Sequence, residues 1–121
     1  MEECAAPIRP YAALYVGGMG SREQNFYNQL ASRMGYEKAA VEVQERYLAR
    51  DYNGAAAAVP VEFIDATSLI GPPDRIKERL SAYSEAGVTT LTISASQGTL
   101  EQRVAMLRAM RDILDSAGLG S

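Results

Sequence analysis

Apolar side chains recur at helical spacing near the middle of the second half of the chain. Ile76, Leu80 and Tyr83 lie four and three residues apart, and the positions between them are largely charged or small. A Gly-Pro-Pro turn precedes this stripe, and Gly87 follows it as a helix-ending glycine. The pattern predicts an amphipathic helix over about 72–86.

A second helical stripe lies close to the C-terminal end of the sequence. Thr99 and Gln102 match a helix-capping box, in which each side chain bonds the backbone N–H group of the other residue. The pattern predicts a helix over about 99–117 that ends at Gly118. Its apolar face consists of Leu100, Val104, Leu107, Met110 and Leu114.

The segment between these helices, VTTLTIS at 88–94, has the composition of a β-strand. Five of its seven residues are β-branched, which favours a strand over a helix. Leu91 and Ile93 would face one side, and Thr90 and Thr92 the other. Helix–strand–helix is the unit of a parallel α/β sheet, but the sequence offers no clear neighbouring strands, and a complete (β/α)₈ barrel takes about 250 residues. We therefore expect the end of a larger α/β protein.

The first half of the chain is predicted to be helical. Residues 2–16 favour a helix, with a buried strand at YAALYV as the alternative, and the glycines of GGMGS at 17–21 end that element. Phe26, Leu30 and Met34 predict a helix that begins near Ser21 and ends at Gly35. Further helices are expected over about 36–50 and after Pro60 as the first helical residue. The alanine-rich stretch 53–59 is expected to form a short helix or a turn.

Composition removes several classes of function. The 121 residues carry a net charge of −3 and no cluster of Lys and Arg, so the sequence predicts no nucleic-acid partner. The chain contains no histidine and a single cysteine, Cys4, which excludes Ser-His and Cys-His catalysis and an internal disulfide, and predicts no metal site. No apolar run approaches the length of a membrane span, and we expect a cytoplasmic protein without membrane contact.

Two stretches carry a family likeness. RPYAALYVGGMGSREQNFYNQLASRMGYEKAA and SLIGPPDRIKERLSAYSEAGVTTLTIS resemble the C-terminal part of the luciferase-like (bacterial luciferase) superfamily of oxidoreductases. The GGMG and NFY motifs are most similar to the branch that uses the deazaflavin coenzyme F-420. The resemblance extends from about Ala5 to Leu119, and it implies that residues 1–121 form the C-terminal segment of a TIM-like (β/α)₈ barrel, predominantly helical here.

The resemblance implies a chemistry and a set of partners. The chemistry would be hydride transfer between the deazaflavin and an organic small-molecule substrate, with no catalytic residue identified in this chain. An FMN-dependent monooxygenase is the alternative within the family, and a non-catalytic helical interaction module is the alternative outside it. We expect the chain alone to be inactive, and to form a homo-oligomer or to pair with the missing portion of the barrel.

Two loops are the candidate contacts for cofactor or substrate. The first follows YAALYV; it could be a plain helix connection with Phe26 packed inward, or a loop over the barrel mouth. The second follows VTTLTI and leads to the N-terminus of the last predicted helix, where backbone N–H groups favour anions; an ordinary connection with a capping Thr99 is the alternative. The candidate residues are Gly17, Gly18, Met19, Gly20, Asn25 and Tyr27 in the first loop, and Ser94, Ser96, Gln97 and Gly98 in the second.

Overall fold

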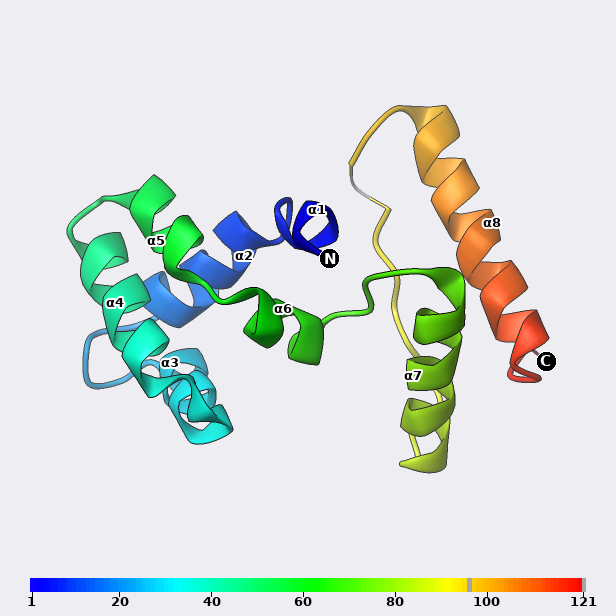
Figure 1. Cartoon of the computed structure of the whole chain (residues 1–121), viewed down its shortest axis with the longest axis horizontal. Helices are drawn as coiled ribbons and strands as arrows, with labels where there is room; N and C mark the ends of the chain where they lie inside the picture. Colours follow the sequence, from blue (N-terminus) through cyan, green and yellow to red (C-terminus); the bar gives the residue numbers. More distant parts are fainter. Residues whose placement is uncertain (96, 121) are drawn as a thin grey trace. The chain divides into compact units, whose positions relative to one another are not determined.

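The computed structural model describes residues 1–95 and 97–120. The chain divides into two compact units, residues 1–70 and residues 71–121. Helices are the regular elements of both units (Figure 1), and within the described ranges no β-strand forms. Ser21 and Gln24 make an isolated antiparallel bridge in a turn. The predicted predominance of helix is therefore confirmed.

The first unit consists of short helical segments packed around a small core. Five of the eleven buried residues of this core are alanines, so that the helices approach one another closely. The alanine-rich stretch, expected as a helix or a turn, is a helix. The segment after Pro60 is helical as predicted, although Pro60 precedes the first helical turn instead of opening it. The elements are α1 (Glu2–Ala5), α2 (Arg9–Ala13), the π-helix η1 (Leu14–Gly18), α3 (Phe26–Ala31), the π-type turn η2 (Ser32–Tyr36), α4 (Glu37–Leu48), α5 (Tyr52–Ala58) and α6 (Val61–Thr67).

The helix predicted from Ser21 begins later in the structure, and it buries a different face from the predicted one. It starts at Phe26, because residues 21–24 form a turn and the Asn25 side chain caps the first helical turn. Phe26 and Met34 are exposed, whereas Ala31 is buried, so the prediction that Phe26 packs inward is wrong. The predicted end at Gly35 is confirmed, since this residue has a positive φ of 98° and produces the kink before α4.

Arg9 ties distant segments of the first unit together. Its guanidinium lies 2.6 Å from a carboxylate oxygen of Glu2 and also donates to the backbone carbonyl of Val59. Glu2 belongs to α1, and Val59 lies between α5 and α6. A single side chain thereby bonds the N-terminal helix to a segment about fifty residues away.

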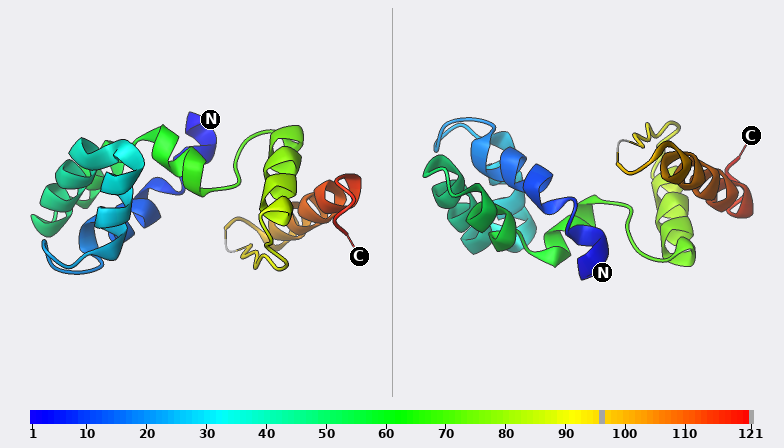
Figure 2. Two further views of the ribbon diagram at one scale, coloured as in Figure 1. Left: turned by 90° about the horizontal axis from the view of Figure 1, so that it is seen from below. Right: turned by 90° about the horizontal axis from the view of Figure 1, so that it is seen from above.

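The second unit contains the two helices with the clearest sequence signals. They are α7 (Pro73–Glu85) and α8 (Leu100–Ser116), and both agree with the predicted ranges. The helices contact each other and lie side by side in the views of Figures 1 and 2. Leu80 and Ile113 are the buried apolar residues of this unit among those described. Its core is therefore much smaller than that of the first unit.

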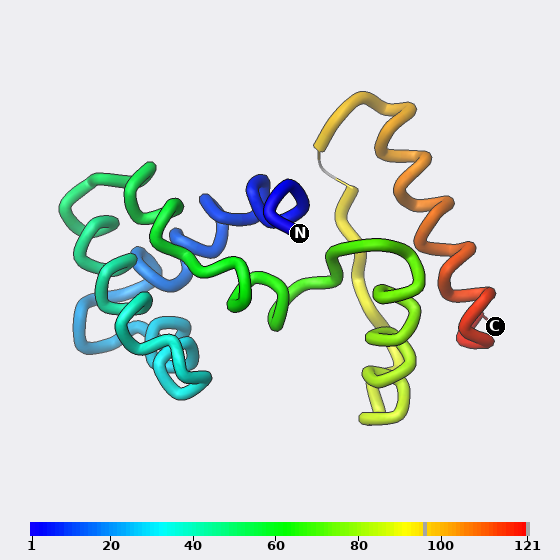
Figure 3. Tube along the Cα trace, viewed as in Figure 1, coloured from blue at the N-terminus to red at the C-terminus, as the bar shows by residue number. Residues whose placement is uncertain are grey.

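The predicted strand at 88–94 is wrong for this structure. The segment leaves α7 and reaches α8 without helical turns and without a paired strand (Figure 3, yellow). A strand is defined by hydrogen bonds to a neighbour, and no second extended segment of the described residues lies against it. The β-branched composition is therefore present, but the partner that would make the segment a strand is not.

Candidate functional site

The glycines of the first candidate loop allow α4 to approach η1. Gly17 is buried, and a Cβ atom added to it would lie 2.6 Å from the Cβ atom of Tyr47 and 3.0 Å from the carbonyl oxygen of Val43. A Cβ atom on Gly18 would overlap the aromatic ring of Tyr47. Both positions therefore require glycine for packing inside the unit. Gly20 has a positive φ of 151°, which suits the turn around Ser21.

Asn25 is a buried structural residue of the first unit. Its amide nitrogen donates to the carbonyls of Tyr15 and Val16, at 3.1 Å each, and its side-chain oxygen accepts from the backbone N–H of Asn28 at 3.0 Å. Its side chain is almost completely buried. All of these bonds are internal, so the geometry favours a structural role for Asn25 over a ligand contact.

Asn28 completes this arrangement and was missed by the sequence analysis. Its amide nitrogen donates to the carbonyls of Val16, at 3.0 Å, and of Ala40, at 2.8 Å. Asn25 and Asn28, which we call the asparagine clamp, therefore bond three elements, η1, α3 and α4. The three-residue spacing of two asparagines behind a glycine-rich turn is the signal that could have revealed it.

Tyr27 belongs to an exposed row of aromatic rings beside the same turn. Its ring meets that of Tyr15 edge to face at 4.8 Å, Tyr15 lies 4.9 Å from Tyr11, and Phe26 lies 5.4 Å from Tyr27. The side chains of Tyr11 and Phe26 are 63% and 62% exposed. We call these four residues the aromatic row. The i, i+4 spacing of Tyr11 and Tyr15 in YAALY was the available sequence signal.

The hydroxyl groups of Tyr11 and Tyr15 lie 3.1 Å apart. This hydrogen bond to Tyr11, together with the electrostatic effect of Tyr11, desolvation and the electrostatic effect of Tyr27, raises the pKa of Tyr15 above the usual tyrosine value. Tyr15 therefore stays protonated at neutral pH. The aromatic row presents ring edges and faces beside a hydrogen-bonded pair of hydroxyl groups, which suits contact with an apolar or aromatic group.

The second candidate loop belongs to the second unit and serves the start of α8. The hydroxyl of Thr99 accepts from the backbone N–H of Gln102 at 3.2 Å, and the Gln102 side chain accepts from the Thr99 N–H at 2.8 Å. Gly98 has a positive φ of 86°. Ser94, Gln97 and Gly98 are exposed, and Ser96 lies outside the described residues. The capping box is confirmed, and the anion contact stays a prediction.

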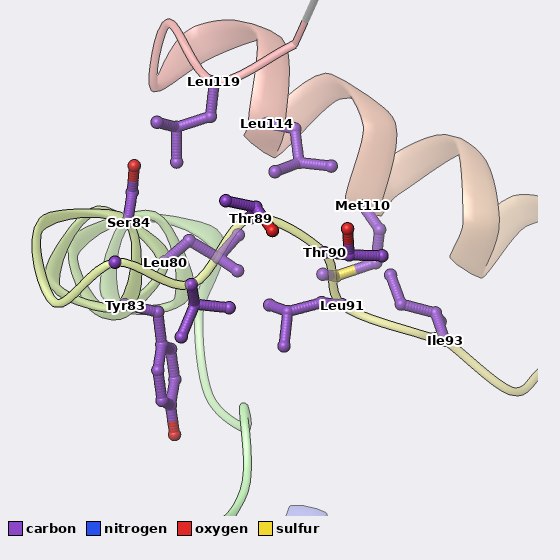
Figure 4. A pocket seen from close by; sticks show the side chains of 12 residues that line it. Leu80, Tyr83, Ser84, Thr89, Thr90, Leu91, Ile93, Met110, Leu114 and Leu119 are labelled. Carbon is purple, nitrogen blue, oxygen red and sulfur yellow. The ribbon is translucent and has the colours of Figure 1, made fainter.

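An apolar hollow of about 440 Å³ lies in the second unit (Figure 4). Side chains of α7, of α8 and of the segment between them line it, and Leu91 and Met110 point into it from different elements. The sequence analysis assigned these residues to two amphipathic helices and the strand between them, and did not predict a hollow. Its main lining residues are Leu80, Tyr83, Leu91, Ile93, Met110 and Leu114.

Across residues 1–95 and 97–120, no group of three or more His, Cys, Asp or Glu side chains is arranged to hold a metal ion. Within the same ranges, none of the helices combines the length and the apolar character that a membrane crossing requires. Cys4 is exposed and free. The features that remain as candidate sites are the turn with its aromatic row, the loop before α8, and the hollow.

Comparison with known proteins defines the class. The family of luciferase-like monooxygenases matches residues 2–90, and the chain belongs to this family, as its motifs indicated. A Mycobacterium tuberculosis protein, provisionally named a coenzyme F-420-dependent oxidoreductase, is 35% identical over 97 residues. The match covers 80% of this chain and 27% of that relative, so the chain spans about a quarter of the relative's length. No solved structure matches the chain.

Proposed function

We propose that the chain forms part of an oxidoreductase that transfers a hydride between the deazaflavin coenzyme F-420 and an organic substrate. The observation that carries this proposal is the 35% identity over 97 residues to a relative named for that coenzyme. In such enzymes the cofactor supplies the hydride chemistry, and the protein binds and orients it. A (β/α)₈ barrel, with this chain as its C-terminal segment, belongs to the same proposal.

The residues of the first loop do not by themselves make a cofactor cradle. The space that Gly17 and Gly18 leave open is filled by the ring of Tyr47. The side-chain amide of Asn25 uses its donors on backbone carbonyls of the same unit. A deazaflavin therefore does not fit against these three residues, and no catalytic step is assigned to them.

The proposed role of this chain is to hold a surface against a cofactor or substrate that other parts of the enzyme enclose. The asparagine clamp fixes the turn, and the turn leaves Met19 and Tyr27 exposed. Met19, Gly20 and Tyr27 are therefore the proposed contacts in the first unit. Ser94, Gln97 and Gly98 are the proposed contacts in the second.

A chimera tests the proposal. The stretch of the M. tuberculosis relative that aligns with this chain is replaced by the corresponding residues of this chain, and coenzyme F-420 and FMN are titrated in parallel by visible absorption. We expect the chimera to bind F-420 as the unaltered relative does. We expect the purified 121-residue chain to show no turnover and to bind F-420 weakly or not at all.

Matched tyrosine variants separate a contact from a general loss of folding. Tyr27→Ala in the chimera should weaken F-420 binding, whereas Tyr52→Ala, which removes another exposed tyrosine, should leave it unchanged. Equal effects of the two variants would contradict the proposed contact at Tyr27. A folded chimera that fails to bind F-420 would contradict the proposed cofactor.

Two other functions have specific support. The matching family is described as one of monooxygenases, which favours FMN as the alternative cofactor; selective binding of FMN by the chimera would establish it. The exposed apolar face of the second unit favours a helical interaction module without catalysis. A chimera that folds but binds neither cofactor, together with an intact chain that captures a protein partner, would support the module.

A further inference from the structure

The segment 88–94 presents two different sides between α7 and α8. Leu91 and Ile93 line the apolar hollow together with side chains of both helices (Figure 4). Thr92, which lies between them in the sequence, is exposed and does not belong to the described residues that line the hollow. Successive side chains of an extended backbone point to opposite sides, so Thr92 faces away from the two helices. Thr90, nearer the start of the segment, also lines the hollow, so this alternation holds from Leu91 onward.

In the proposed barrel, the side of the segment that faces away from the helices is the interior. The helices of a (β/α)₈ barrel form an outer ring, and the side chains along each strand alternate between this ring and the interior. α7 precedes the segment 88–94 and α8 follows it, as the two flanking helices of a barrel strand do. Leu91 and Ile93 then pack beneath the helices, and the Thr92 side chain projects inward. This step rests on the proposed function.

Thr92 also lies near the end of the segment at which barrel enzymes bind their ligands. The active sites of these barrels form at the C-terminal ends of the strands. Ser94, already a proposed contact, lies two residues further on, which is about 6–7 Å along an extended chain. The loop then continues to the capping box at the start of α8. The Thr92 hydroxyl therefore belongs to the interior side, just below the proposed contacts of the loop.

We infer that the hydroxyl group of Thr92 binds the coenzyme F-420 of the proposed reaction from the interior side of the barrel. Bulky apolar residues dominate barrel interiors, so a hydroxyl group at this position needs a hydrogen-bond partner. It can donate to a carbonyl oxygen of the deazaflavin ring or accept from a ring N–H group. Gly17, Gly18 and Asn25 do not supply such a contact, because their space and their donors are used inside the first unit.

Valine and serine variants in the chimera of the M. tuberculosis relative test this contact. Thr92→Val replaces the hydroxyl by a methyl group of nearly the same shape, and should raise the F-420 dissociation constant about three- to tenfold. Thr92→Ser keeps the hydroxyl group, and its dissociation constant should stay within about twofold of that of the unaltered chimera. Thr89→Val is the matched control: Thr89 lines the hollow, so the same loss of a hydroxyl should leave the dissociation constant unchanged.

Cysteine labelling tests the orientation of the side chain without a measurement of activity. In the chimera, N-ethylmaleimide should modify Thr92→Cys, and F-420 should slow this reaction. Leu91→Cys, packed beneath the helices, should react slowly with or without F-420, and mass spectrometry locates the label. An unchanged dissociation constant in Thr92→Val, or equal labelling and protection at positions 91 and 92, would overturn the inference and leave the proposed cofactor standing. A chimera that fails to fold or to bind F-420 would count against the proposed function and would overturn the inference with it.

Discussion

Replacing Asn25 tests whether the asparagine clamp holds the first unit together or only caps a helix. Asn25 is 1% exposed and both donates to backbone carbonyls and accepts from the N–H of Asn28. Asn25→Ser keeps an oxygen for the cap and removes the amide donors. Asn25→Ala removes both functions. Asn25→Asp keeps the acceptor and places a second oxygen against the carbonyls of Tyr15 and Val16.

The expected losses of stability follow from these bonds. In Asn25→Ser, Val16 keeps the amide of Asn28, so the main loss is the side-chain partner of the Tyr15 carbonyl, about 1–2 kcal/mol. Asn25→Ala adds the loss of the cap and should cost about 2–4 kcal/mol. Asn25→Asp buries a carboxylate against two carbonyls and should cost most, about 3–5 kcal/mol. If Asn25 only capped the helix, Asn25→Asp would cause almost no loss of stability, because Asn and Asp are equally good N-caps.

Urea unfolding followed by tyrosine fluorescence provides the assay. Six of the seven tyrosines lie in residues 1–70 and the chain has no tryptophan, so the signal reports mainly on the first unit. Asp51→Asn is the control: it alters an exposed N-cap and an exposed ion pair with Arg46, and should leave the urea midpoint at neutral pH almost unchanged. An Asn25→Asp variant as stable as the unaltered chain would show that the carbonyl contacts contribute nothing and would refute the clamp.

Three further variants test other parts of the structure by the same unfolding measurement or by circular dichroism. Gly18→Ala should destabilise the first unit by about 1–3 kcal/mol through overlap with the ring of Tyr47, and a second change, Tyr47→Leu, should recover part of this loss; independent, additive effects would contradict the contact. The backbone N–H of Gly54 and then Arg46 lower the pKa of Asp51, so its contribution is present above the ordinary aspartate pKa and is lost as pH falls through the lowered value. Stability should therefore decline below about pH 4 more steeply than in Asp51→Asn, and identical acid profiles would refute this. Thr99→Ala should reduce the helical content of the second unit at a cost of about 1 kcal/mol, whereas an unchanged spectrum and melting curve would show that the capping box is unimportant.

The helices of the second unit could be predicted from local sequence signals. The apolar stripe of α7, the capping box at Thr99 and the helix-ending Gly87 and Gly118 are local signals, and each is confirmed. The hydrogen bonds of a helix join residues four apart, so the sequence within the element contains most of the information needed to predict it. The family was also recognisable, because the GGMG and SLIGPP motifs are short and contiguous.

The candidate loop around Gly17 could be located from sequence, but its interpretation depended on tertiary contacts. Gly17 and Gly18 suggested a loop open to a ligand, and only the packing of Tyr47 shows that α4 uses that space. Asn25 suggested a polar contact, and only the carbonyl groups of η1 show that its bonds are internal. These partners lie up to thirty residues away in the chain, where periodicity carries no information about distance.

The segment 88–94 shows most clearly what the sequence alone could not predict. Its β-branched residues and its alternation determine a preference for extended backbone, and they identify Leu91 and Ile93 as residues of one side. Whether the segment becomes a strand was decided by the tertiary structure, in which none of the described residues pairs with it. A helix supplies its own hydrogen-bond partners, whereas a strand takes them from another segment of the same chain or of a second one.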